Sequence, residues 1–239
     1  MGPGLAATLW DLDGTLLYTL EDLGDSLNQA LAEEGLPGHS YDDYRLMVGN
    51  GQRLLVTRAL PEDRRDPEKV GRVYNGFTIR YRANQCRKSR PYPGVPELLA
   101  ELKARGFKLA VLSNKNQDNT TAVVNHYFPG LFEVAWGLSP QRPAKPDPTA
   151  ALALAETLGL SPDRFIYLGD SAVDMKTAQR AGMWPVGVTW GYRGRAELAA
   201  AGAALLVDSP AELQGFVLDL YPAGVKPHGL NSPNGQVDS

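Results

Sequence analysis

Short apolar segments alternate with helical stretches along most of this 239-residue chain, and this alternation restricts the fold more than any other feature. The apolar segments, each suited to one short buried strand, are residues 5–10, 107–112, 132–136, 165–168, 185–190 and 204–207. Helical patterns lie between them at residues 96–105, 117–127, 148–158, 173–181 and 197–201. Such alternation is typical of a parallel sheet covered by helices on both faces. We therefore expect an α/β fold with a doubly wound parallel sheet.

The segment between the first two strands has a different pattern. Helical spacing runs through residues 20–36, 41–48, 52–60 and 67–84, and no convincing strand lies between residues 20 and 90. We therefore expect an all-helical domain at residues 18–90, inserted into a core made of residues 1–17 and 91–221. The tail, residues 222–239, contains Pro, Gly, Asn and Ser with almost nothing to bury, and we expect it to be disordered.

Composition excludes several classes of protein. The chain has 24 Lys and Arg against 27 Asp and Glu, so it lacks the basic surface expected of a nucleic-acid binder. Its one cysteine, Cys86, cannot form an internal disulfide, which favours a reducing compartment such as the cytoplasm. No apolar stretch approaches the ~20 residues of a membrane-spanning helix, and the N-terminus lacks the features of a signal peptide. We expect a protein without a membrane anchor.

The first predicted strand ends in two acids, Asp11 and Asp13, followed by Gly14. Residues two apart in a strand project to the same side, and glycine lets the chain turn sharply away from them. Like charges this close need a cation or a shared proton. A strand end with paired carboxylates therefore indicates a metal-assisted reaction centre.

Polar residues follow other predicted strands in the same way. They are Ser113-Asn114, the isolated Lys145-Pro146, and the run from Asp170 to Asp174. Each alone has an ordinary explanation, since Asp170 could cap a helix, Ser113-Asn114 could form a turn and Lys145 could be solvated. In an open parallel sheet, however, ligands gather beyond the carboxyl ends of the strands. We expect these segments to meet at one edge.

The order and spacing of these motifs resemble those of the haloacid dehalogenase-like hydrolase superfamily over essentially all of residues 5–221. The resemblance implies a Rossmann-like core with a helical cap, and a phosphoryl-transfer reaction. It implies that Asp11 attacks phosphorus and that Asp13 protonates the leaving oxygen and then activates water. It further implies that Mg²⁺ is held by Asp11, the main-chain oxygen of Asp13, and Asp170. Asp174 would position the lysine or the metal shell.

The same resemblance assigns a phosphate-binding role to a second group of residues. Ser113 and Asn114, together with backbone amides near Gly14 and Thr15, would bind the non-bridging oxygens. Lys145 would add positive charge at the transferring group.

A weaker resemblance, to phosphoglycolate phosphatases, lies in Gly49-Asn50-Gly51 and in the two segments 113–115 and 188–192. The glycine loop would then contact the substrate's leaving group, although it could equally be a turn between two helices. Arg53 could contact a substrate carboxylate or could be a solvated helix position. Members of the superfamily often have Asp-Ser where this chain has Tyr18-Thr19, which leaves the contacts of the cap hinge open.

We therefore expect a Mg²⁺-dependent phosphatase acting on a small anionic phosphomonoester, with 2-phosphoglycolate as the best single substrate. Alternatives are another small substrate such as a sugar phosphate, a sugar phosphomutase, or a non-catalytic binding module. A dehalogenase is disfavoured because that reaction has no use for the acid at Asp13. We expect a monomer or a homodimer, with no nucleic-acid partner.

Overall fold

The computed structural model describes residues 4–220, and the predicted tail at residues 222–239 lies outside them. Six strands form one parallel sheet in the order β5-β4-β1-β6-β7-β8. The strands are β1 (Ala7–Trp10), β4 (Lys108–Asn116), β5 (Val134–Leu138), β6 (Phe165–Gly169), β7 (Trp184–Val188) and β8 (Leu205–Val207). The sheet confirms the expected doubly wound α/β fold.

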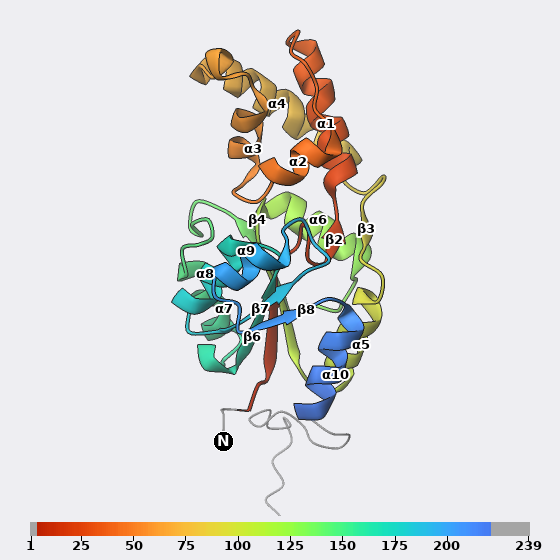
Figure 1. Ribbon diagram of the computed structural model, residues 1–239, viewed down its shortest axis with the longest axis vertical. Helices are drawn as coiled ribbons and strands as arrows, with labels where there is room; N and C mark the ends of the chain where they lie inside the picture. The colour runs from red at the N-terminus through yellow and green to blue at the C-terminus, as the bar shows by residue number, and fades with distance from the viewer. Residues whose placement is uncertain (1–3, 221–239) are drawn as a thin grey trace, which may run out of the picture.

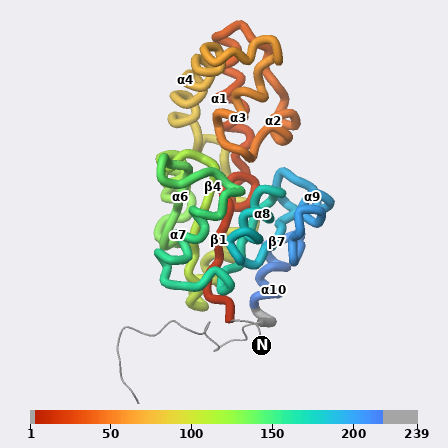
Figure 2. Tube along the Cα trace, turned by 90° about the vertical axis from the view of Figure 1, so that its left-hand side faces the viewer, coloured from red at the N-terminus to blue at the C-terminus, as the bar shows by residue number. Residues whose placement is uncertain are grey.

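Helices cover both faces of this sheet (Figures 1 and 2). They are α5 (Val95–Ala104), α6 (Gln117–Tyr127), α7 (Thr149–Thr157), α8 (Ala172–Arg180), α9 (Arg195–Ala200) and α10 (Pro210–Leu220), with a short 3₁₀ turn η2 (Pro162–Arg164). One apolar cluster joins alternate strand residues to α5, α6 and α10, and another joins the intervening residues to α7 and α8. In β4, for example, Leu109 and Val111 enter the first cluster while Ala110 and Leu112 enter the second. The strands therefore read as continuous apolar runs because both of their faces are buried.

Four further helices stand beyond the carboxyl ends of the strands (Figure 1). They are α1 (Leu20–Glu33), α2 (Tyr41–Met47), α3 (Gln52–Ala59) and α4 (Pro67–Asn84), with a 3₁₀ turn η1 (Glu62–Arg64) between the last two. They share an apolar cluster of their own, which includes Leu27, Val56 and Phe77. Residues 20–84 thus have a hydrophobic core separate from the two clusters against the sheet.

Two very short strands, β2 (Leu17–Tyr18) and β3 (Arg90–Pro91), pair antiparallel where the chain leaves the sheet and returns to it. The sequence did not predict them, because two residues carry no detectable strand pattern. The C-terminal helix α10 was also not predicted. The predicted strand at residues 185–190 ends earlier, at Val188, so that Thr189 and Trp190 belong to a loop.

Candidate active site

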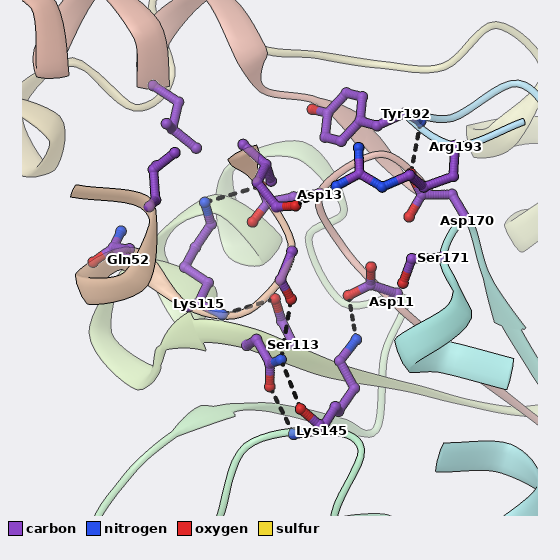
Figure 3. Close-up of a pocket in the computed structure, with 16 residues that line it drawn as sticks. Asp11, Asp13, Gln52, Ser113, Lys115, Lys145, Asp170, Ser171, Tyr192 and Arg193 are labelled. Carbon is purple, nitrogen blue, oxygen red and sulfur yellow. Dashed lines mark hydrogen bonds and ion pairs between the residues drawn. The ribbon is translucent and has the colours of Figure 1, made fainter. Parts of the chain in front are cut away.

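The strand order gathers the polar strand ends at the centre of the sheet. Because β1 lies between β4 and β6, Asp11 after β1 is flanked by Ser113–Lys115 on β4 and by Asp170 after β6. Figure 3 shows these side chains around one pocket, together with Lys145 and residues from the helices above. The convergence expected from the four motifs is present.

A tight turn at Gly14 separates Asp13 from the rest of the chain. Gly14 has a φ of +91°, and a Cβ built on it would lie 2.3 Å from Oδ2 of Asp170, so only glycine fits here. Its N–H donates to the carbonyl of Leu17 (2.9 Å), and the N–H of Thr15 donates to the carbonyl of Leu12 (3.4 Å). Neither Gly14 nor Thr15 lines the pocket. Both N–H groups are thus engaged within the turn, and phosphate binding by backbone amides near Gly14 and Thr15 stays a prediction.

Three buried carboxylates form the acidic part of the site. Asp11, Asp170 and Asp174 each offer an oxygen, and these oxygens lie within 4.8 Å of one another. Burial, followed by the nearby charge of Asp174, raises the pKa of Asp11 to about 7. Burial and the charge of Asp11 raise the pKa of Asp170 well above its usual value. Burial and the nearness of the other acids therefore disfavour the ionised forms of Asp11 and Asp170.

Lys145 supplies part of the compensating charge. Its Nζ lies 2.7 Å from Oδ1 of Asp11 and 2.7 Å from Oδ1 of Asp174. Burial alone would lower the pKa of Lys145, but the charges of Asp11 and Asp174 raise it well above its usual value. The lysine thus remains an ammonium beside Asp11. Asp174, whose Oδ2 also accepts from Ser171, holds this lysine in place.

Asp13 has a different set of partners. Its Oδ1 accepts from Thr19 Oγ1 (2.7 Å) and faces Lys115 Nζ (2.9 Å). Lys115 is buried and also donates to the Tyr81 hydroxyl, which comes from α4 (2.6 Å). Lys115 was given no role from the sequence, although its position next to Ser113-Asn114 at a strand end could have identified it as a site residue. The hydroxyl of Thr19, where the superfamily pattern is broken, bonds directly to Asp13.

Ser113 and Asn114 both line the pocket, but the carboxamide of Asn114 is already engaged. Its Oδ1 accepts from the N–H of Lys145 (2.8 Å), and its Nδ2 donates to the carbonyls of Lys145 and Gly49 (3.2 Å each). Ser113 Oγ accepts from the N–H of Lys115. Asn114 therefore ties the loop of Lys145 to the loop before α3, and its amide does not point freely at a ligand.

The loop after β7 connects the acid cluster with the helices above. The N–H of Tyr192 donates to Oδ2 of Asp170 (2.7 Å), while the Tyr192 ring packs in the apolar cluster of α1–α4. Arg45 of α2 donates to the carbonyls of Gly191 and Tyr192. Arg193 in turn donates to three carbonyls at the end of α2, those of Arg45, Leu46 and Val48. Paired arginines thus join the two parts of the molecule beside Asp170.

The glycine loop before α3 reaches the pocket only in part. Gly49 and Gly51 line it, whereas Asn50 and Arg53 are exposed, and the Arg53 guanidinium lies over the Tyr74 ring (5.6 Å). Gln52 lines the pocket in place of Arg53, because one residue along a helix turns the side chain through about 100°. The exposure of Arg53 favours the solvated helix position of the two predictions, and its contact with a substrate carboxylate stays a prediction.

Comparison with known proteins identifies the family. The family model described as haloacid dehalogenase-like hydrolase matches residues 8–188. The chain belongs to this family of hydrolases. A phosphoglycolate phosphatase of Caulobacter vibrioides is 38% identical over 190 residues, covering 78% of this chain and 80% of the relative. Another, from Aquifex aeolicus, is 32% identical over 185 residues, covering 77% and 84%. A solved structure described as a predicted phosphoglycolate phosphatase from Haemophilus somnus has a TM-score of 0.82 and 31% identity, covering 90% of this chain and 98% of that one.

The acid cluster of this haloacid dehalogenase-like hydrolase fits a hard divalent cation. Its donors are carboxylate oxygens, which such ions prefer, and a cation would favour the ionised forms of Asp11 and Asp170 that burial and the neighbouring acids disfavour. Among residues 4–220, no helix combines the length and the apolar character needed to cross a bilayer.

Proposed function

We propose that this hydrolase is a Mg²⁺-dependent phosphatase that cleaves a small phosphomonoester through an aspartyl-phosphate intermediate. The observation that carries the proposal is the separation of two acid–lysine pairs in one pocket. Asp11 pairs with Lys145, and Asp13 pairs with Lys115. One carboxylate is thus available to attack phosphorus, and the other to handle the proton of the leaving oxygen.

Asp11 and Asp170 would hold the metal, together with the main-chain oxygen of Asp13. Both oxygens of Asp174 are occupied by Lys145 and Ser171, which favours a positioning role for this residue. Bound Mg²⁺ would supply positive charge that screens the anionic substrate from the carboxylates and stabilises the transferring group.

The chain's own residues account for both chemical steps. Asp11 attacks phosphorus as Asp13 gives a proton to the leaving oxygen, so that the P–O ester bond breaks and an acyl phosphate forms on Asp11. Asp13, now a carboxylate, takes a proton from water, which attacks the phosphoryl group and releases phosphate and free Asp11. Lys145 keeps Asp11 oriented and balances charge on the phosphoryl oxygens, while Thr19 and Lys115 hold Asp13.

Residues 18–90 would act as a cap domain on a core made of residues 1–17 and 91–221. Their separate apolar cluster supports this division, as does the antiparallel pairing of β2 with β3 at the crossing point. The paired arginines Arg45 and Arg193 would keep the cap closed over the pocket, which excludes water during the first step.

We propose 2-phosphoglycolate as the substrate, hydrolysed to glycolate and phosphate. The named relatives at 32–38% identity support this choice. Three apolar side chains also line the pocket, Leu23 of α1, Val48 directly after α2 and Leu55 of α3, which favours a small leaving group over a sugar. The single cysteine supports a reducing compartment, and we place the enzyme in the cytoplasm as a monomer or homodimer.

Phosphate release from a panel of monoesters, with Mg²⁺ and with EDTA, tests this function. We expect release from 2-phosphoglycolate in Mg²⁺ only, with a higher kcat/KM than from any sugar phosphate in the panel. Asp11→Asn should abolish turnover while the circular dichroism spectrum stays that of the folded protein. If the purified protein with Mg²⁺ releases no phosphate from any monoester, the proposal is wrong.

A further inference from the structure

Lys115 is a buried cation with donor capacity to spare. Its side chain is 1% exposed and lies among the residues lining the pocket. Two of its three N–H donors are used, by Oδ1 of Asp13 (2.9 Å) and by the hydroxyl of Tyr81 (2.6 Å). Within residues 4–220, its ammonium has no third hydrogen-bond acceptor. A ligand oxygen in the pocket could therefore take the remaining N–H.

The two pocket lysines serve opposite ends of the reaction. Lys145 contacts Asp11, which the proposed function places at phosphorus. Lys115 contacts Asp13, which that function places at the leaving oxygen. Figure 3 shows the two ammonium groups reaching these aspartates from different sides of the pocket. Lys115 is thus within one hydrogen bond of the residue that meets the leaving group.

Gln52, which lines the same pocket as Lys115, provides independent evidence that the pocket binds a ligand. It is 8% exposed at the first position of α3, and it lines the pocket. Its Oε1 accepts from Asn116 Nδ2, but its Nε2 is buried and has no hydrogen-bond partner among the described residues. A buried donor left unpaired costs free energy, so a donor in this position favours an acceptor supplied by the ligand.

We propose that Lys115 and Gln52 form a subsite for a carboxylate on the carbon that bears the phosphate ester. This inference rests on the proposed phosphatase function. In such a 2-phosphocarboxylate the ester oxygen and the carboxylate share one carbon. When the ester oxygen meets Asp13, the carboxylate is therefore within hydrogen-bonding reach of Lys115. The ammonium binds it as a charge-assisted donor, and the Gln52 amide supplies a neutral donor. Lys115 and Gln52 are then specificity-determining residues.

The rest of the wall restricts the substrate further. The side chains that the helices α1 and α3 contribute beside Gln52 are Leu23 and Leu55, and neither can bond to the hydroxyls of a sugar. A larger polar leaving group would leave those hydroxyls unpaired. The subsite therefore selects a short 2-hydroxy acid phosphate over a sugar phosphate.

A pair of substrates of similar size tests the subsite. 2-Phosphoglycolate has the carboxylate, and ethyl phosphate has a methyl group in its place. We would measure kcat/KM for both with the wild-type protein and with Lys115→Met, Gln52→Leu and, as a matched control, Lys176→Met, whose lysine is exposed on α8. The readout is the ratio of the two kcat/KM values, because a general loss of activity cancels in it.

We expect Lys115→Met to lower this preference for 2-phosphoglycolate at least ~10-fold, and Gln52→Leu to lower it ~3- to 10-fold. Lys176→Met should keep the wild-type ratio. If both pocket variants lose activity equally on the two substrates, the subsite is refuted while the phosphatase function stands. If the wild-type protein hydrolyses no monoester, the function itself fails first.

Binding measured without turnover covers the case in which Lys115→Met does not fold. We would measure by calorimetric titration the affinities of two proteins, Asp11→Asn and Asp11→Asn with Gln52→Leu, for 2-phosphoglycolate and for ethyl phosphate. If the double variant binds 2-phosphoglycolate more weakly and ethyl phosphate as before, the result supports the subsite. An equal change for both ligands, or no change, overturns it.

Discussion

Replacing Asp11 with Asn should remove a large part of the pH dependence of stability in the metal-free protein. Burial and the charge of Asp174 raise the pKa of Asp11 from 3.8 to about 7. Between about pH 4 and about pH 7 the folded protein therefore keeps a proton on Asp11 that the unfolded chain has lost. Because the folded state binds more protons, the free energy of unfolding falls as the pH rises through this window. A shift of about three pKa units corresponds to roughly 4 kcal/mol.

The variant lacks this contribution because an amide does not titrate. Its stability relative to wild type should therefore rise with pH by up to roughly 4 kcal/mol, and should level off above about pH 7. Urea unfolding in EDTA, followed by circular dichroism from about pH 4 to about pH 8, measures the difference. Asp118→Asn, on the exposed first turn of α6, is the control and should show no such trend.

The protonation of Asp11 in the folded protein can be tested in two ways. If Asp11→Asn and wild type lose stability in parallel as the pH rises, Asp11 is already ionised in the folded protein and the electrostatic account of the cluster is wrong. Added Mg²⁺ should stabilise wild type at about pH 8 by neutralising the cluster, and should stabilise the variant much less.

Three further perturbations test other parts of the site. Gly14→Ala should weaken Mg²⁺ binding in calorimetry and destabilise the fold by about 1–3 kcal/mol, since its Cβ would meet Asp170 at a φ of +91°; wild-type affinity would contradict that close approach. Arg193→Gln should speed hydrogen–deuterium exchange at the end of α2, where its guanidinium holds three carbonyls, and an unchanged exchange pattern would mean that other contacts hold this end of α2. EDTA should stop phosphate release and Mg²⁺ should restore it, whereas full activity in EDTA would rule out a role for the metal.

Local pattern was enough to predict the sheet and the edge at which the site lies. Apolar segments that alternate with helices require a covered parallel sheet, and the carboxyl ends of parallel strands share one edge. Asp11, Lys145 and Asp170 could therefore be assigned to one site before their contacts were known. The limits of local pattern appear in β2 and β3, which are too short to have a period, and at Asn114, whose partners come from distant loops.

The sequence by itself thus determined the class of fold, the family and the group of acids and lysine that would meet. Only the tertiary structure decided how these groups pair. The position of β1 between β4 and β6 brings Lys115 to Asp13, and the packing of α4 adds Tyr81 to that pair. The rotation of α3 turns Gln52 to the pocket and leaves Arg53 in solvent. The physical reason is range: a side chain's direction follows from its own strand or helix, whereas its partner depends on how separate elements pack.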